Sequence, residues 1–188
     1  MCPRVVEPVH TPKQFFLCLT VGWGRSDRIG HGIDVHKFAE NVEKHKPLKL
    51  AGITVSDKYS LLAHSDGDVV LHAICDALLG ACSKGDIGEH FPDSDSEFNN
   101  IDSAQLLERV LSIASETKLG IINIDVTVIA EVPKLSPLRE KMIKSLCDLL
   151  SLNSSRCNLK ATTTEGLGYL GRKEGIACHC IVLMKKNV

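Results

Sequence analysis

Residues Arg28–His36 read Arg-Ile-Gly-His-Gly-Ile-Asp-Val-His, and Leu61–His72 read Leu-Leu-Ala-His-Ser-Asp-Gly-Asp-Val-Val-Leu-His. If the first stretch is extended, its side chains alternate between two faces. Asp34 and His36 then share one face, which is half of a metal site, while His31 lies on the opposite face and drops out of the ligand set. Glycines in both stretches allow the backbone to approach a bound group.

The second stretch leads into a helix. We expect Ser65 or Asp66 to cap a helix that runs through apolar residues to a stop at Gly80. That helix carries His72, which adds a second imidazole to the Asp-x-His pair. Two imidazoles and one carboxylate are typical ligands of a zinc-type divalent ion with an open fourth position. The spacing leaves open the alternative that all three are ordinary hydrogen-bonded polar residues.

The rest of the hydrophobic pattern predicts an α+β fold in the order β-β-α-α-β-α-β-β. A long-looped hairpin would join Arg28–His36 to a strand at Leu48–Val55. Asp102 or Ser103 would cap a second helix, and Pro137 fits the first turn of a third. Further strands are expected at Ile121–Ala130, Cys157–Thr164 and Ile176–Lys185, and turn-rich loops at Gly85–Gly88 and Phe91–Asp95.

The last predicted strand is apolar on both faces, although helices can cover only one face of such a sheet. Ala177, Ile181 and Leu183 would lie opposite Ile176 and its neighbours at even positions. Something else must bury the second face, and the pattern therefore predicts self-association.

Composition restricts the class of protein. The chain has 188 residues, 44% of them hydrophobic, which suits one compact domain. It has 22 basic and 23 acidic residues and only 4% aromatics, so nucleic acid is not an expected partner. The eight cysteines are scattered through apolar stretches, which favours buried reduced thiols. Cys178 and Cys180 have no second pair at zinc-ribbon spacing.

Residues 1–27 differ from the domain expected at 28–188. They contain three prolines, the only Trp and few acids, and their apolar run, Phe15–Val21, is too short to span a bilayer. The composition is typical of a transit-peptide remnant, which would place the protein in a plastid stroma, of a chloroplast or an apicoplast. The alternative is a disordered or artefactual extension on a bacterial cytoplasmic protein. No membrane association is expected.

A third cluster of polar residues follows the strand predicted at Cys157. Thr162, Thr163 and Thr164 offer hydroxyl donors to phosphate oxygens, and Glu165 offers a hard oxygen ligand for magnesium or manganese. The alternative is a threonine run that ends a β-strand.

Two basic side chains suit phosphate as well. Arg172 either clamps a diphosphate or is a solvated turn residue, and His64 either contacts a phosphate oxygen or merely neighbours the helix cap. The sequence contains no P-loop and no dinucleotide-binding glycine motif. The residues alone therefore indicate metal-assisted phosphoryl chemistry.

These motifs, in this order, resemble the signatures of the 2-C-methyl-D-erythritol 2,4-cyclodiphosphate synthase family of the non-mevalonate isoprenoid pathway. The resemblance runs from Arg28 to about Lys186 and is carried by Arg28–His36, Leu62–Asp68 with His72, Gly85–Gly88, Phe91–Asp95, and Ala161–Glu165 with Gly171 and Arg172. It implies a phosphorus–oxygen lyase. The 2-phosphate of 4-diphosphocytidyl-2-C-methyl-D-erythritol 2-phosphate would attack the β-phosphorus, releasing CMP and forming the cyclic diphosphate.

The resemblance also implies roles for individual residues. Zinc would be held by Asp34, His36 and His72, and Mg²⁺ or Mn²⁺ by Glu165 and the substrate phosphates. His64 and Thr163 would be catalytic by stabilising charge on the transferring phosphoryl group. The implied substrate-binding residues are Ser65, Asp86, Ile87, Gly88, Phe91, Asp93, Asp95, Ala130, Pro133, Lys134, Leu135, Thr162, Thr164, Tyr169 and Arg172.

The implied assembly is a homotrimer with active sites between subunits. The implied fold is a mixed β-sheet with helices packed on one face, in a chorismate-mutase-like or ferredoxin-like layer, with the sheets packing together in the trimer. Glu131 and Val132 depart from the family's nucleotide-pocket motif, and Tyr169 stands where phenylalanine is common. Two other functions stay open: a metal-dependent phosphodiester hydrolase, and a non-catalytic assembly module that binds metal.

Overall fold

The structure, a computed structural model, describes residues 27–42, 46–92, 98 and 100–186. Its centre is a four-stranded sheet in the order β1-β6-β4-β5, with bounds Asp27–Lys37 (β1), Gly175–Lys186 (β6), Leu119–Ile129 (β4) and Cys157–Thr162 (β5). The β4–β5 pair is parallel, whereas β1–β6 and β4–β6 are antiparallel. This is the predicted mixed sheet. The extension at residues 1–26 lies outside the described residues.

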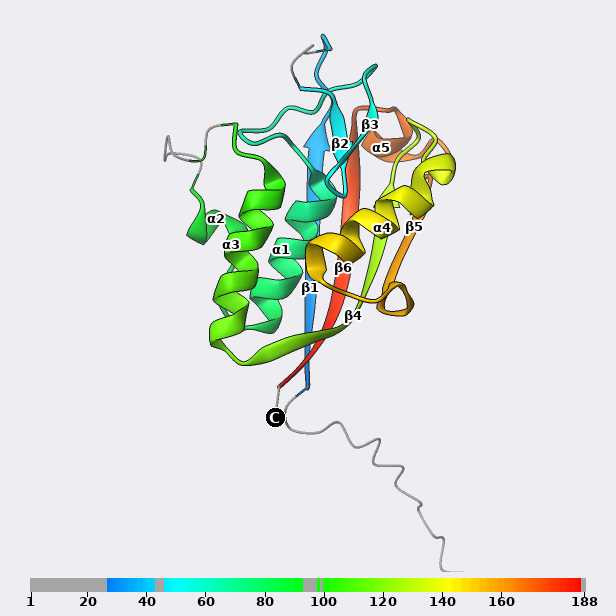
Figure 1. The fold of residues 1–188 in the computed structure, drawn as a ribbon. Coiled ribbons are helices and arrows are strands. Elements are labelled where there is room, and N and C mark those ends of the chain that lie inside the picture. Colours follow the sequence, from blue (N-terminus) through cyan, green and yellow to red (C-terminus); the bar gives the residue numbers. More distant parts are fainter. Residues whose placement is uncertain (1–26, 43–45, 93–97, 99, 187–188) are drawn as a thin grey trace, which may run out of the picture.

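The three long helices lie on the same side of this sheet (Figure 1): α1 (Val69–Ala81), α3 (Ser103–Glu116) and α4 (Arg139–Leu150). The expected α+β layer is therefore confirmed. Shorter helical segments are α2 (Ile87–His90), α5 (Gly168–Gly171), η2 (Ser136–Leu138) and η3 (Ser154–Arg156). Within the described ranges no helix is long and apolar enough to cross a membrane.

The predicted hairpin between Arg28–His36 and Leu48–Val55 is wrong. β1 pairs along its whole length with β6, and Leu48–Val55 instead folds back on itself as β2 (Leu48–Leu50) and β3 (Ile53–Ser56). The turn is formed by Ala51 and Gly52, both with positive φ, a geometry that suits two-residue hairpins. The apolar run of this segment thus covers the domain core from a separate small sheet.

Helix α1 packs directly on the backbone of β1 because two glycines leave room for it. A Cβ atom at Gly30 would lie 1.7 Å from the carbonyl oxygen of Ala77, and one at Gly32 would lie 1.9 Å from that of Ala73. Any side chain at either position would push the helix off the strand. The two glycines of the opening motif therefore set the distance between α1 and the sheet.

The N-cap of α1 is Asp68, not Ser65 or Asp66 as predicted. Its carboxylate is fully buried and accepts hydrogen bonds from the backbone N–H groups of Val70, Leu71, Ala51 and Gly52. The cap therefore also ties α1 to the β2–β3 turn. A sequence pattern of helix caps does not reveal this second set of donors.

Smaller differences concern element ends. The expected turn-rich loop contains α2, capped by Asp86, and the strand predicted at Cys157–Thr164 ends at Thr162. In β4 an irregularity at Ile122 shifts the register against β6 and turns that apolar side chain outward. Of the two predicted caps of α3, Asp102 is the N-cap, and Pro137 lies in η2, directly before α4 begins at Arg139.

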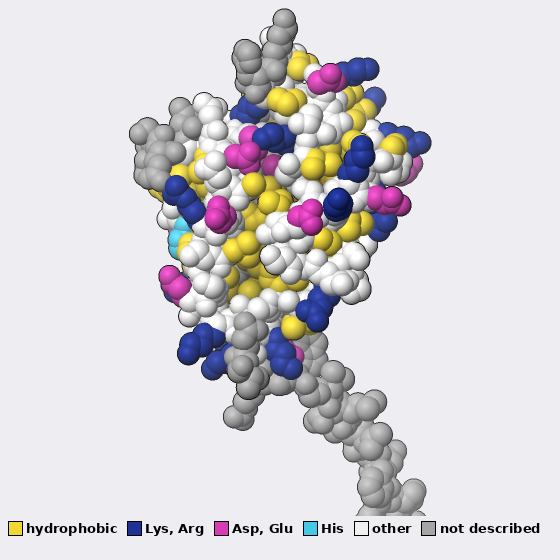
Figure 2. All heavy atoms as spheres, in the orientation of Figure 1, with side chains coloured by type: hydrophobic (Ala, Val, Ile, Leu, Met, Phe, Trp, Pro, Cys, Tyr) yellow, Lys and Arg dark blue, Asp and Glu magenta, His cyan; other side chains and the backbone are white. Residues whose placement is uncertain are grey.

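The side of the sheet away from the helices carries exposed apolar residues. Ile29, Ile33 and Ile181 are 56%, 48% and 51% exposed, respectively. The prediction that helices cover only one face is confirmed. On the opposite, helix-covered side, Figure 2 shows charged side chains around a central hydrophobic area. All six cysteines within the described ranges are free thiols.

We expect Gly32→Ala to destabilise the fold strongly, because its methyl group would collide with the backbone of α1. The loss in the free energy of unfolding should be about 3 kcal/mol or more, measured by urea denaturation. Gly80→Ala is the matched control: Gly80 lies within α1 with nothing within 4 Å of an added Cβ. That substitution should stabilise by about 0.5–1 kcal/mol. Equal effects of the two would contradict the packing described.

Candidate metal centre and substrate pocket

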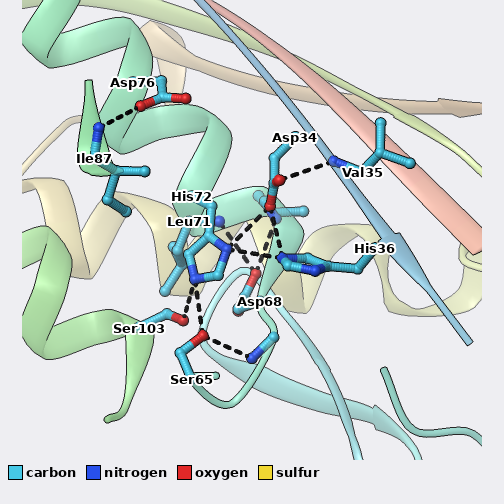
Figure 3. Close-up of polar contacts among 12 residues, drawn as sticks. Asp34, Val35, His36, Ser65, Asp68, Leu71, His72, Asp76, Ile87 and Ser103 are labelled. Carbon is cyan, nitrogen blue, oxygen red and sulfur yellow. Dashed lines mark hydrogen bonds and ion pairs between the residues drawn. The ribbon is translucent and has the colours of Figure 1, made fainter. Parts of the chain in front are cut away.

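The three predicted metal ligands meet at one point (Figure 3). Asp34 and His36 project from β1 on the side that faces the helices, and His72 projects from the first turn of α1. Asp34 Oδ2 is 2.9 Å from His36 Nε2 and 3.0 Å from His72 Nδ1, and the two nitrogens are 3.0 Å apart. The strand alternation therefore identified the correct face, and His31 lies on the opposite face beside His179.

The size and chemistry of this triangle suit a divalent metal ion. Tetrahedral zinc ligands, about 2.0–2.1 Å from the ion, are about 3.3 Å from one another. The observed separations between the three ligand atoms are slightly shorter, as expected for atoms that form hydrogen bonds with one another. Within the described ranges this is the only cluster of three or more His, Cys, Asp or Glu ligand atoms close enough to hold an ion.

The carboxylate of this centre is held in its charged form. Burial disfavours the charge on Asp34, but hydrogen bonds and ion pairing with His36 and His72 outweigh burial, so the pKa of Asp34 lies well below its usual value. Asp34 therefore stays ionised and ready to bind a cation throughout the neutral pH range.

The other nitrogen of His72 is held by residues that the sequence did not indicate. His72 Nε2 is 2.9 Å from Ser103 Oγ and 3.1 Å from Ser65 Oγ, and Ser103 also contacts Asp66. Ser65 was predicted to bind substrate; in the structure its buried hydroxyl faces His72. Ser103 was identified only as a helix cap, because the approach of α3 to α1 is not visible in the local pattern.

The metal centre opens into a cavity of about 590 Å³. Several predicted substrate-contacting residues line it: His64, Ser65, Ile87, Gly88 and Phe91. Its apolar wall also includes residues that sequence reasoning missed, namely Leu62, Phe98, Ile101 and Leu106. Asp86 stands next to this wall as the cap of α2, whereas Asp93 and Asp95 lie outside the described residues.

The remaining predicted site residues form a separate group. β1, β4 and β5 point the same way, so the segment after Thr162 lies at the same end of the sheet as His36. However, β1 and β5 are the two edge strands, about 14 Å apart at the usual strand spacing. None of Thr162, Thr163, Thr164 or Glu165 lines the cavity beside the metal centre.

This second group is held together by Glu131. Its carboxylate accepts hydrogen bonds from the backbone N–H and hydroxyl of Thr164 and from the N–H of Gly166. These bonds lower the pKa of Glu131. The Thr163 hydroxyl donates to Glu165, so the predicted hydroxyl and carboxylate pair is formed. Glu131, which departs from the family's nucleotide-pocket motif, thus holds the threonine-rich loop (Thr162–Glu165) in place.

The other members of this group vary in exposure. Ala130 donates its N–H to the carbonyl of Thr162, and Leu135 is buried next to exposed Lys134. The Val132–Pro133 peptide bond is cis. Two more predicted substrate residues are exposed around α5: Tyr169 is 48% exposed, and Arg172 pairs with Glu174.

Together, fold and site define an α+β protein with a candidate three-ligand metal site at the mouth of a cavity large enough for a small organic substrate. The chain belongs to the YgbB family, whose model matches residues 27–185. The family resemblance seen in the sequence motifs is thereby confirmed.

Relatives named 2-C-methyl-D-erythritol 2,4-cyclodiphosphate synthase are similar over the same region. The one from Pseudoalteromonas atlantica is 47% identical over 161 residues, covering 86% of this chain and 97% of the relative. The one from Nitrosococcus oceani is 50% identical over 157 residues, covering 84% and 97%.

Solved structures agree with the fold. The CDP complex of IspF from Plasmodium falciparum matches with a TM-score of 0.74 and 36% identity over 86% of this chain and 98% of that one. The bifunctional IspDF from Campylobacter jejuni matches with a TM-score of 0.80 and 44% identity. That match covers 86% of this chain but only 42% of the bifunctional protein.

Metal affinity should depend on pH through His72. Burial lowers the pKa of this ring, but Asp34 and the charges of Asp68 and Asp66 raise it by more, so the pKa of His72 lies above its usual 6.5. Because the pKa of His72 is raised, protons compete with zinc for its ring nitrogen at a higher pH than usual. As the pH decreases through this pKa, zinc affinity should fall by about tenfold per pH unit. Chelator competition from about pH 8 to about pH 5 measures this.

His31→Ala is the control for this titration, because His31 lies on the opposite face of β1 and should leave the profile unchanged. A zinc affinity that stays constant across the range would contradict the assignment of His72 as a ligand.

Proposed function

We propose that this chain is a 2-C-methyl-D-erythritol 2,4-cyclodiphosphate synthase. It converts 4-diphosphocytidyl-2-C-methyl-D-erythritol 2-phosphate to 2-C-methyl-D-erythritol 2,4-cyclodiphosphate and CMP, as a phosphorus–oxygen lyase of non-mevalonate isoprenoid biosynthesis. The observation that carries this proposal is the Asp34, His36 and His72 centre at the mouth of a cavity, in a chain about half identical to synthases of that name.

The reaction exchanges one phosphorus–oxygen bond for another. An oxygen of the 2-phosphate attacks the β-phosphorus, and the bond between that phosphorus and the oxygen bridging to the α-phosphate breaks, so CMP leaves. The nucleophile is already an anion, so no general base is required. Catalysis then depends on holding the two phosphates together and on stabilising the charge between them.

The chemistry of these ligands suggests what a bound metal ion would do in the proposed reaction. Zinc bound to Asp34, His36 and His72 would act as a Lewis acid toward the β-phosphate. Two neutral imidazoles and one carboxylate leave the bound ion with a net positive charge, which favours an anionic ligand at the open position. His64 is exposed at the same cavity and is proposed to donate to the transferring phosphoryl group.

The second group supplies the nucleotide side of the proposed site. Thr163 donates to phosphoryl oxygens and Glu165 holds Mg²⁺ or Mn²⁺ together with the substrate phosphates. The other proposed substrate contacts in this group are Ala130, Pro133, Lys134, Leu135, Thr162, Thr164, Tyr169 and Arg172. Ser65, Asp86, Ile87, Gly88, Phe91, Asp93 and Asp95 are proposed to contact the erythritol end of the substrate.

A homotrimer with active sites between subunits reconciles these two groups. The metal centre lies beside edge strand β1 and the threonine-rich loop follows edge strand β5, so within one chain the two groups are separated by the width of the sheet. The apolar face with Ile29, Ile33 and Ile181 gives copies of the chain a surface to bury against one another. A neighbouring chain would then bring its threonine-rich loop to the metal centre.

The proposed location depends on residues 1–26, which precede the family match and lie outside the described residues. Their acid-poor composition supports a transit segment directed to a plastid stroma, with a bacterial cytoplasm as the alternative.

Incubation with the cytidylyl substrate tests the reaction directly. We expect equal amounts of CMP and cyclic diphosphate, separated by anion-exchange chromatography and identified by ³¹P NMR. CMP with a linear phosphate product would indicate the hydrolase instead. Asp34→Asn should reduce the rate by at least about 100-fold, because it removes the anionic ligand of the metal centre. An unchanged rate with zinc lost would favour the assembly module.

Mixed trimers test the site between subunits. Asp34→Asn and Glu165→Gln chains should each be inactive alone. When they are co-expressed, about one site in four combines an intact metal centre with an intact loop from the neighbour, and activity should recover to about that fraction. If all groups of a site came from one chain, the mixture would stay inactive. Analytical ultracentrifugation confirms that both variants still assemble.

A further inference from the structure

The side of His72 that faces away from the metal centre contacts a chain of buried polar residues (Figure 3). Nε2 lies between the hydroxyls of Ser103, at 2.9 Å, and Ser65, at 3.1 Å. Ser103 is the first residue of α3 and is fully buried. Behind it lies Asp66. Neither Ser103 nor Asp66 belongs to the ligands or the substrate contacts proposed above.

The carboxylate of Asp66 determines the direction of these hydrogen bonds. Its Oδ1 accepts from the hydroxyl of Ser103 at 2.5 Å and from the backbone N–H of Ser103 at 3.2 Å. A carboxylate only accepts, and a serine hydroxyl has one proton to donate. Ser103 therefore has no proton left for His72, and its oxygen accepts the proton that Nε2 carries.

Lys49 holds the charge of Asp66 in place. Its ammonium group, on β2, is 3.2 Å from Asp66 Oδ2 and 3.1 Å from Asp102 Oδ2. Asp102 also caps α3 through the N–H of Ala104, so the acceptor chain is fixed at both ends. The contacts from Lys49 through Asp66 and Ser103 to His72 thus link four elements. In that order they are β2, the loop that precedes α1, helix α3 and helix α1.

We infer that Asp66 and Ser103 keep a proton on His72 Nε2, so that a metal ion beside Asp34 and His36 displaces the proton that Nδ1 otherwise donates to Asp34 Oδ2, 3.0 Å away. A neutral imidazole carries one N–H, so fixing it on one nitrogen makes the other a metal ligand. Histidines that bind metals commonly donate their second nitrogen to a carboxylate. Here a serine hydroxyl stands between ring and carboxylate, and both residues are positioning residues for the proposed metal site.

The tautomer is measured first in the zinc-loaded wild-type protein, which needs no substrate and in which the metal takes the place of the Nδ1 proton beside Asp34. Long-range ¹H–¹⁵N NMR should show His72 with a protonated Nε2 and a metal-bound Nδ1, the signal being assigned by its loss in His72→Gln. The opposite tautomer would overturn the inference. It would leave the proposed reaction, which the product assay tests, untouched.

Asp66→Asn tests the direction of the network. The new amide can donate to Ser103, which frees the serine proton to point at His72 Nε2 and favours the tautomer with its proton on Nδ1. We expect a protonated Nδ1 and a bare Nε2 in the ¹⁵N spectrum of the metal-free variant, together with zinc affinity about 10–100-fold lower by chelator competition. An affinity loss without the tautomer change, or unchanged affinity, would count against the inference.

Ser103→Ala and Ser103→Thr form a matched pair, because both are small changes but only threonine keeps the hydroxyl. Zinc affinity should fall about 10–100-fold in the alanine variant and return to near the wild-type value in the threonine variant. Ser65→Ala should keep the wild-type tautomer, since Asp66 and Ser103 stay in place. If Ser65→Ala alone changed the tautomer, Ser65 and not Ser103 would be the positioning residue.

Discussion

The contact between β1 and α1 is the constraint on which the rest of the site depends. Gly30 and Gly32 carry no side chain, so the backbone of α1 near Ala73 and Ala77 packs directly on the strand backbone. The same strand carries Asp34 and His36, and the same helix carries His72. Three ligand atoms can come within about 3 Å of one another only if their two elements are this close. The packing of the core and the geometry of the metal centre therefore have one cause.

The loop before α1 fixes the orientation of these elements with two carboxylates. Asp68 turns inward and collects N–H groups from α1 and from the β2–β3 turn. Asp66 turns the other way and accepts from Ser103 and Lys49. Burying two carboxylates so close together is costly unless each has several donors, and each does. The loop thus holds the helix in place with one acid and orients the ring of His72 with the other.

Local patterns in the sequence predict those features of the fold that depend on residues close together in the chain. The face shared by Asp34 and His36 follows from strand alternation, and the sheet with helices on one side follows from hydrophobic periodicity. Pairing between distant strands does not follow: β1 pairs with β6, nearly 150 residues away, and the nearer Leu48–Val55 segment was the wrong partner. The contact between Ser103 and His72 was not predicted for a related reason. The Ser103 hydroxyl reaches His72 only because α3 packs against α1.

The position of the two polar groups on the sheet is the reason for proposing a site shared between chains. Both groups lie at one end of the sheet, but on opposite edge strands, with β6 and β4 hydrogen-bonded between them. Within one chain the two groups are therefore separated by the width of the sheet, whose β1–β6 and β4–β6 pairs form the centre of the core. A second chain can supply the missing group without any change in fold. In the proposed homotrimer, burial of the exposed isoleucines on the uncovered face would supply hydrophobic free energy for association, and the same association would complete the proposed site.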